Sequence, residues 1–169
     1  MKTLILLRHG KSDWDAGDFP DHDRPLAKRG LKAARAMGRF LGLAGQAPES
    51  AVTSSAVRAR ATLEEAAGAG GWKCRVRVTR ALYEATPMEA LQEVRAEPDA
   101  TDRLILVGHE PTWSELAVLL MGGGSLRMPT ASMLRIDFDV DSWKEVAYGG
   151  GRLAWMIPPR LFTDGDFEL

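Results

Sequence analysis

The stretch that most constrains the fold is a run of four aliphatic residues, Leu4–Leu7, followed directly by Arg8-His9-Gly10. A short apolar run bounded by polar residues is typical of a strand buried on both faces, in the middle of a parallel sheet. Open α/β proteins bind ligands at the carboxyl ends of such strands. The arginine offers paired donors for phosphate or carboxylate oxygens, and the histidine can act as a nucleophile or acid–base. The sequence therefore predicts an anion site at this strand end.

The same design recurs later in the chain. Arg103–Val107 is a second aliphatic strand, and it is followed by a glycine and His109. Because the carboxyl ends of parallel strands lie on the same side of a sheet, we expect His9 and His109 to share one crevice. Arg58 follows a third predicted strand, Ser50–Ser54, and we expect it to enter the crevice from the first turn of a helix. The positive end of that helix would also favour an anion.

Apolar spacing and turn residues divide the rest of the chain into further strands and helices. The predicted helices are Pro25–Leu43, Ala56–Ala67, Thr86–Ala96 and Thr112–Met121, and the remaining predicted strands are Cys74–Val78, Ser132–Phe138 and Arg152–Ile157. Ser54 or Ser55 is the expected cap of the second helix, and glycines are expected to end the first two helices. The segment 11–24 has no period and is predicted to be a loop over the strand end.

This order predicts one α/β domain of three layers, α/β/α. Its central sheet is mostly parallel, and the last two strands are antiparallel additions because only loops connect them. A length of 169 residues, of which 45% are hydrophobic and 27% charged, is ordinary for a single domain with a real core. Cys74 is the only cysteine, which favours a reducing, cytoplasmic setting.

Charge and hydropathy exclude two classes of partner. The formal net charge is −1, whereas nucleic-acid-binding domains usually carry a basic field. No run approaches the ~20 apolar residues of a membrane span. The positive charge is uneven, however, because one predicted helix carries a cluster that can be a solvated face or a docking site for an acidic partner. The cluster consists of Lys28, Arg29, Lys32, Arg35 and Arg39.

Several familiar motifs are absent from the sequence. No glycine-rich loop ends in Gly-Lys-Ser/Thr, and the two glycine triplets lack the dinucleotide fingerprint, so no nucleotide cofactor is expected. His109-Glu110 has Trp113 where a zinc protease carries its second histidine. Three histidines and one cysteine make a structural metal site unexpected. His22, in a loop rich in aspartate, is predicted to be a surface residue.

Taken together, the motifs resemble those of the histidine phosphatase (phosphoglycerate mutase-like) superfamily. The matching segments are, in chain order, Arg8-His9-Gly10 with Ser12 and Trp14, Leu26 with Gly30 and Ala34, Ser54–Thr62, Leu82-x-Glu84, and Gly108-His109. They keep the family's order from residue 3 to about residue 120. The resemblance implies the phosphoglycerate mutase-like fold.

Within that superfamily the short chain looks most like the SixA-type phosphohistidine phosphatases. The details that resemble them are Lys11-Ser12-x-Trp14-Asp15 and Asp23-Arg24-Pro25-Leu26. Two departures argue against a mutase. Asp15 stands where mutases carry an asparagine that contacts phosphate, and the chain lacks the length of the insertions that cover a mutase active site. Whether Ser12, Asp15 or Arg24 touches phosphate is left open by the sequence.

The resemblance makes His9 the nucleophile that forms a phosphohistidine intermediate, which water then hydrolyses. It implies no metal, because cationic side chains surround the phosphoryl oxygens. Neighbouring cations also favour the neutral imidazole, which is the form that can attack. Glu84 is the candidate proton donor to the leaving group, and a solvated loop carboxylate is its alternative interpretation. The expected phosphate-binding residues are Arg8, Arg58, His109 and Ser12.

These inferences predict a metal-independent phosphatase without a cofactor. Its expected substrate is a phosphohistidine-bearing protein, since an open crevice suits a phosphorylated side chain that another protein presents. A phosphatase for small phosphate esters is the main alternative, and a non-catalytic phosphoprotein-binding module is a third. The sequence does not determine the oligomeric state, and a monomer is the starting expectation.

Overall fold

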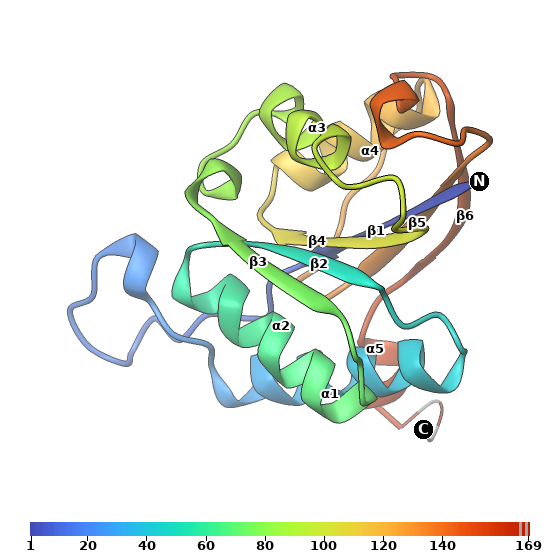
Figure 1. The fold of residues 1–169 in the computed structure, drawn as a ribbon. Coiled ribbons are helices and arrows are strands. Elements are labelled where there is room, and N and C mark those ends of the chain that lie inside the picture. Colours follow the sequence, from blue (N-terminus) through green and yellow to red (C-terminus); the bar gives the residue numbers. More distant parts are fainter. Residues whose placement is uncertain (166, 168) are drawn as a thin grey trace.

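The computed structural model describes residues 1–165, 167 and 169, and its elements alternate between strands and helices (Figure 1). The strands are β1 (Lys2–Arg8), β2 (Ser50–Ser54), β3 (Arg75–Thr79), β4 (Arg103–Gly108), β5 (Met133–Phe138) and β6 (Gly151–Ile157). The α-helices are α1 (Lys28–Leu43), α2 (Val57–Gly70), α3 (Pro87–Arg95), α4 (Thr112–Met121) and α5 (Arg160–Thr163). Short 3-10 helices are η1 (Asp21–Asp23), η2 (Arg80–Leu82) and η3 (Trp143–Glu145).

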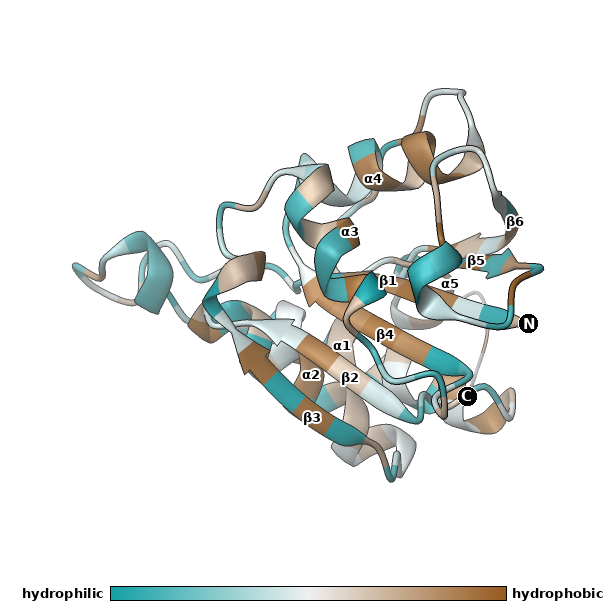
Figure 2. Ribbon diagram, turned by 45° about the horizontal axis from the view of Figure 1, so that its top comes forward, coloured by the Kyte–Doolittle hydropathy of each residue, from teal (hydrophilic) through white to brown (hydrophobic). Residues whose placement is uncertain are grey.

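The six strands form one sheet in the order β3-β2-β4-β1-β5-β6. β1 pairs in parallel with β4 and antiparallel with β5, and β6 pairs antiparallel with β5. The mostly parallel sheet with antiparallel additions is therefore confirmed. β1 lies in the interior of the sheet, as its continuous apolar run predicts. In Figure 2 β4 is hydrophobic over most of its length, whereas the edge strand β3 alternates with hydrophilic residues.

Side chains of β1 alternate between two cores, which makes the protein a three-layer α/β/α structure. Leu4 and Leu6 pack with residues of α3 and α4 on one face of the sheet. Ile5 and Leu7 pack with residues of α1 and α2 on the other face. All four side chains are completely buried, and burying each contributes about 1.5–3 kcal/mol. The two helical layers thus fix β1 in the centre, and its carboxyl end becomes the natural place for a site.

The end of α2 differs from the one predicted. Glycines at 68 and 70 are expected to end α2 near Ala67, but the helix runs on to Gly70. α1 and α2 approach so closely that a Cβ on Gly38 would overlap the carbonyl oxygen of Ala66, and one on Gly42 would overlap that of Gly70. Only a residue without a side chain allows the two backbones to approach so closely. These glycines are therefore part of the helices instead of ending them.

The helix starts also needed correction. α1 does not begin at Pro25: it begins at Lys28, because Leu26 forms an isolated bridge with Ser12 and keeps the chain extended. Neither Ser54 nor Ser55 caps α2, whose N-cap is Ala56 and has no side-chain cap. The prediction of a helix after Thr86 is confirmed, and Thr86 forms a capping box with Glu89.

Candidate active site

The carboxyl ends of β1 and β4 bring the two predicted histidines together. Arg8 is in register with Gly108, and the His9 backbone N–H donates to the Gly108 carbonyl at 3.0 Å. One residue further on, the rings of His9 and His109 lie with their centroids 5.1 Å apart. The two histidines are therefore neighbours, as predicted, but they line two different cavities, which share Arg58. Gly10 is needed for a close approach, because a Cβ there would lie 2.9 Å from the Gly30 carbonyl oxygen of α1.

One hydrogen bond determines which nitrogen of His9 faces the crevice. Nδ1 lies 2.7 Å from the Gly10 carbonyl oxygen, and a carbonyl can only accept, so Nδ1 carries the proton. In the neutral ring, Nε2 then keeps its lone pair. Burial lowers the pKa of His9 to about 4, and the nearby charges of Arg58, Arg8 and Arg24 act in the same direction. At neutral pH His9 is thus a neutral base with Nε2 available.

Three arginines surround this histidine. Arg8, Arg24 and Arg58 line, with His9, a cavity of about 240 Å³ whose other lining residues are Lys11, Ser12, Trp14 and Thr130. We call it the His9 cavity. The Nε atom of each arginine is buried and has no hydrogen-bond partner among the described residues. The three arginines bring three positive charges to the wall of one cavity, which suits an anion.

Asp21 anchors two of the arginines, Arg24 and Arg58, from outside the cavity. Its Oδ2 accepts from Arg58 Nη2 at 3.1 Å, and its Oδ1 accepts from Arg24 Nη2 at 2.5 Å. The Tyr83 hydroxyl donates to the same carboxylate at 2.9 Å. Partial burial opposes ionisation of Asp21, but the bonds from Tyr83 and Arg58 outweigh it and hold the pKa of this carboxyl below its usual range. The clamp uses the terminal nitrogens and leaves each Nε free.

Ser54 holds the opposite ring nitrogen of His109. Ser54 Oγ accepts from the Ala56 backbone N–H at 3.3 Å and lies 2.8 Å from His109 Nε2. A serine hydroxyl can both donate and accept, so this contact orients the ring with either tautomer. Burial, followed by the charges of His9 and Arg58, lowers the pKa of His109 to about 3. Its Nδ1 is buried without a partner among the described residues.

The remaining predicted residues lie around the cavity. Ser12 is buried and lines the His9 cavity, whereas Asp15 is exposed. Glu84 is exposed and lines a second cavity of about 360 Å³, together with Arg58 and His109. Its φ of +55° is unusual for a residue with a side chain. Such backbone strain is often found at functional sites, so the structure places Glu84 beside the histidine pair in a costly conformation.

As a whole, the arrangement presents a neutral imidazole nitrogen to a ring of cationic and neutral N–H donors. Phosphoryl transfer needs a nucleophile in line with the leaving group and positive charge around three equatorial oxygens. These side chains can supply both. A bound dianion would satisfy the buried donors that are otherwise unpaired.

A model of the histidine phosphatase superfamily (branch 1) matches residues 4–105. The chain belongs to this superfamily. The matched segment includes Arg8, His9, Arg58 and Glu84, while His109 lies just beyond it and reaches the site through β4. An uncharacterized protein of Mycobacterium leprae is 39% identical over 123 residues, which cover 70% of this chain and 73% of that protein.

Solved structures of other histidine phosphatases share the fold. A proposed phosphohistidine phosphatase SixA from Nakamurella multipartitia has a TM-score of 0.78 at 30% identity, over 93% of this chain and 96% of that one. A mycobacterial glucosyl-3-phosphoglycerate phosphatase has a TM-score of 0.65 at 19% identity, over 90% of this chain and 97% of that one. The chain is thus a phosphatase of the phosphoglycerate mutase-like fold.

Two site residues of this histidine phosphatase are not identified by the sequence. Arg24 is buried and its guanidinium stacks 3.4 Å from the centroid of the Trp14 ring, which fixes it in the cavity wall. The sequence shows a basic residue followed by Pro25-Leu26, but nothing in it indicates that the side chain turns inward. Asp21 gives no signal beyond its place in an acidic loop.

His22 lies at the surface, as predicted, but its side chain also makes specific contacts. It is only partly exposed, its Nε2 lies 2.9 Å from Ser55 Oγ, and its ring meets that of Tyr83 edge to face. It therefore packs at the margin of the site, because η1 folds back from the loop that projects from the body in Figure 1.

Among the described residues, no helix is both long and apolar enough to cross a bilayer.

Proposed function

We propose that this phosphatase removes the phosphoryl group from phosphohistidine on another protein, through a covalent intermediate on His9. The observation that carries the proposal is the orientation of His9. Its Nδ1 is held by the Gly10 carbonyl, and its Nε2 is left for a cavity that three arginines line. This is the geometry of a nitrogen nucleophile aimed at a bound dianion.

In the first step, the lone pair of His9 Nε2 attacks phosphorus while the bond from phosphorus to the leaving group breaks. The electron pair of that bond goes to the leaving nitrogen or oxygen, which takes up a proton. Arg8, Arg24 and Arg58 hold the three equatorial oxygens, with a further hydrogen bond from His109 Nδ1. This stabilisation acts where charge is spread in the transition state, and it is strongest in a buried site.

In the second step, a water oxygen attacks the phosphorus of phospho-His9 and the P–N bond breaks. The electron pair returns to Nε2, and the water proton must be removed. We assign that proton transfer, and the donation to an alkoxide leaving group in the first step, to Glu84. Guanidinium groups take the part that Mg²⁺ plays in many phosphoryl-transfer enzymes, so the proposed reaction needs no metal.

Two observations favour a protein substrate. The loop that carries Trp14 leaves this side chain largely exposed beside the His9 cavity, so a bulky substrate can approach. The SixA-type relative from Nakamurella, 30% identical over most of both chains, points to the same substrate class. A phosphohistidine also has a labile P–N bond, so the exposed Glu84 is a sufficient proton donor for it.

A phosphatase for small phosphate esters is the second candidate. The strained backbone of Glu84 favours it, since an alkoxide leaving group depends strongly on a positioned acid. The fold shared with a glucosyl-3-phosphoglycerate phosphatase is compatible with it. A non-catalytic binding module fits less well, because it has no use for a free nucleophilic nitrogen.

The proposal is tested by parallel steady-state hydrolysis of a phosphohistidine-bearing protein and p-nitrophenyl phosphate. We expect a clear preference in kcat/KM for phosphohistidine, abolished by His9→Ala. His22→Ala, which removes a histidine at the margin, should retain most of the activity. Comparable or better turnover of the ester would make this an ester phosphatase. Turnover of neither substrate, with retained binding of phosphoprotein, would favour the binding module.

A further inference from the structure

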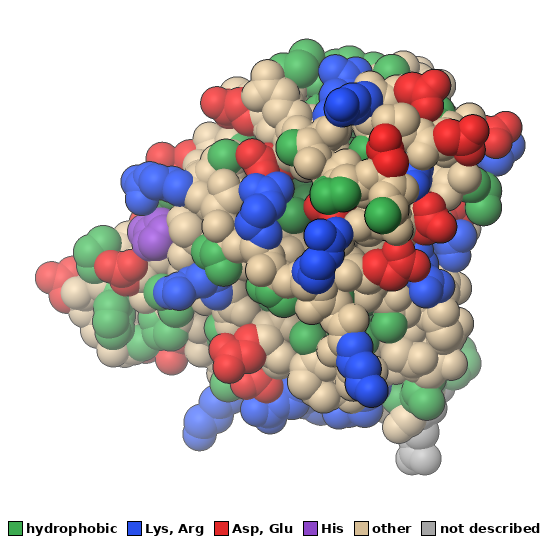
Figure 3. All heavy atoms as spheres, in the orientation of Figure 1, with side chains coloured by type: hydrophobic (Ala, Val, Ile, Leu, Met, Phe, Trp, Pro, Cys, Tyr) green, Lys and Arg blue, Asp and Glu red, His purple; other side chains and the backbone are tan. Residues whose placement is uncertain are grey.

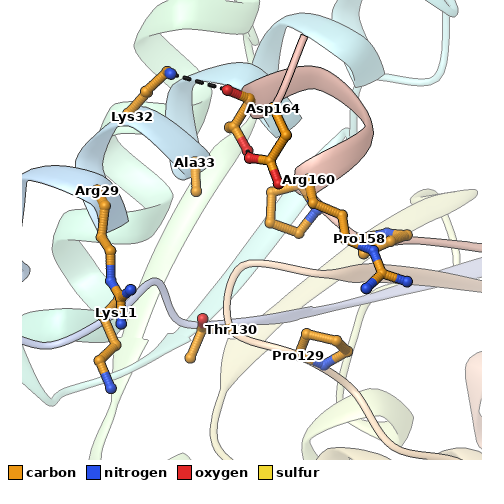
Figure 4. Close-up of a pocket in the computed structure, with 11 residues that line it drawn as sticks. Lys11, Arg29, Lys32, Ala33, Pro129, Thr130, Pro158, Arg160 and Asp164 are labelled. Carbon is orange, nitrogen blue, oxygen red and sulfur yellow. Dashed lines mark hydrogen bonds between the residues drawn. The ribbon is translucent and has the colours of Figure 1, made fainter. Parts of the chain in front are cut away.

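A third cavity opens beside the His9 cavity and has a strongly basic lining. It has a volume of about 390 Å³ and is lined by four basic side chains, Lys11, Arg29, Lys32 and Arg160. We call it the basic groove. Lys11 and Thr130 line both this groove and the His9 cavity, so the two are continuous. Figure 4 shows Lys11 and Arg29 together on one wall and Arg160 on the opposite one.

The structure separates the cluster of basic residues on α1 into members with different surroundings. Arg29 and Lys32 are exposed and line the groove. Arg35 is paired with Glu65 of α2, and Arg39 lines a different depression near Gly42. In Figure 3 basic side chains gather along the edge of the molecule where α1 lies, whereas acidic and basic ones are mixed elsewhere on that face. Two of the five basic residues, Arg29 and Lys32, therefore face the groove, where Lys11 and Arg160 add their charges.

The walls of the groove are built to hold this charge in place. Lys32 Nζ donates to the Thr163 carbonyl at 3.0 Å, which ties α1 to α5. Pro129, Pro158 and Pro159 form much of the remaining lining, and proline offers no N–H and a fixed φ. Among the described residues, the lining has four basic side chains and one carboxylate, Asp164. This charge favours an anionic occupant that binds through the basic side chains.

We propose that the basic groove binds acidic side chains next to the phosphohistidine on the substrate protein. This inference rests on the function proposed above. The His9 cavity takes the phosphoryl group, and the groove begins at Lys11 on its rim. A polypeptide can place a phosphorylated side chain in one and glutamates or aspartates in the other, whereas a small monoester occupies the first alone. Complementary charge of this kind raises the rate of encounter and fixes the orientation.

The test uses two synthetic peptides with one phosphorylated histidine, flanked by glutamates in one and by glutamines in the other. The groove variant is Arg29→Glu/Lys32→Glu. Its matched control is Arg39→Glu/Arg152→Glu, with the same change of charge at two exposed positions outside the groove. We expect the parent to prefer the acidic peptide about tenfold in kcat/KM, as two to three exposed ion pairs allow. The groove variant should lose this preference, and the control should keep it.

Added salt should reduce the preference of the parent, because exposed pairs are screened. Hydrolysis of p-nitrophenyl phosphate should stay within about twofold in all variants, since it does not reach the groove. Equal rates on the two peptides in the parent, or equal losses in both variants, would overturn the groove proposal and leave the proposed function standing. Efficient ester hydrolysis with no turnover of either peptide would instead refute the proposed function. Binding of the unphosphorylated acidic peptide, measured by fluorescence anisotropy, would then still decide whether the groove takes carboxylates.

Discussion

Ser54 Oγ lies 2.8 Å from His109 Nε2 and orients that ring, although Ser54 does not line the His9 cavity. Both partners are buried. At His9 it is the other ring nitrogen, Nδ1, that is held, by the Gly10 carbonyl. In the proposed mechanism the Ser54 hydroxyl donates to Nε2, so that His9 gives a lone pair and His109 Nδ1 gives a hydrogen bond to the same phosphoryl group.

Ser54→Ala tests this division of roles. Without the hydroxyl, neutral His109 is free to move its proton to Nε2, and the donor at Nδ1 is lost. We expect kcat/KM to fall about tenfold, which corresponds to about 1.4 kcal/mol for one buried hydrogen bond. Ser55→Ala, which removes the neighbouring hydroxyl that meets His22, is the control and should have little effect. A normal rate for Ser54→Ala would show that Ser54 does not position His109.

The pH dependence should reflect the lowered pKa of His9. The ring should stay neutral until the pH approaches about 4, rather than titrating near the ordinary value of 6.5. NMR titration of the free enzyme, followed at the ring protons, measures this directly. Between pH 4 and pH 6.5 the His9 ring of an unfolded chain binds more protons than that of the native chain. The free energy of unfolding should therefore fall as the pH drops from 6.5 toward 4. Above pH 6.5 the ring is neutral in both states, so His9 should not affect it.

The loss of stability between pH 6.5 and pH 4 should be smaller in His9→Gln than in the parent protein. The variant lacks one buried ring whose protonation the fold resists. Urea unfolding at pH 7 and pH 5, compared between the two proteins, provides this measurement. If His9 titrated near 6.5, or if acid destabilised both proteins equally, the electrostatic description of the site would be incorrect.

Glu84→Gln separates the two classes of substrate. Loss of a general acid typically costs 10²-fold or more when the leaving group is an alkoxide. A phosphohistidine with its labile P–N bond should lose only about threefold. We therefore expect the ratio of phosphohistidine to ester turnover to rise in the variant. Glu115→Gln, in the same cavity wall, should leave both rates nearly unchanged. Equal losses on both substrates would refute the proposed role of Glu84.

A pair of glycines tests the packing that places α1 and α2. A Cβ on Gly38 would overlap the Ala66 carbonyl oxygen, whereas one on Gly68 would meet nothing within 4 Å. Gly38→Ala should therefore destabilise the fold by about 1–3 kcal/mol or more through overpacking. Gly68→Ala, inside α2, should stabilise it by about 0.5–1 kcal/mol. Urea unfolding of both variants checks the contrast, and similar changes in the two would contradict the close helix contact.

Much of this site could be predicted from the sequence because it depends on strand ends. The apolar runs before His9 and His109 identify two buried parallel strands, and the residues directly after such strands lie at one edge of the sheet. Arg58 could be predicted in the same way, because it lies in the first turn of the helix that follows a third strand. The family resemblance added the chemical roles, and the fold it implied is the one observed.

The rest depends on contacts between segments far apart in the chain. Arg24 turns inward because Trp14 and Asp21 hold it there, and no periodicity reports such a contact. In the sequence, Gly42 and Gly70 look like residues that end a helix. In the structure they lie where α1 and α2 touch. The basic groove joins Lys11 and Arg160, which are separated by nearly the whole sequence. Residue type alone gives no signal for any of these.

The central claim is that His9 carries the phosphoryl group, and rapid-quench trapping with a ³²P-labelled substrate tests it most directly. The account predicts a phosphoenzyme that is stable in alkali and labile in acid, as expected of a phosphoramidate. Peptide mapping should place the label on His9, and His9→Ala should show none. Turnover without any labelled intermediate, or a label on His109, would contradict it.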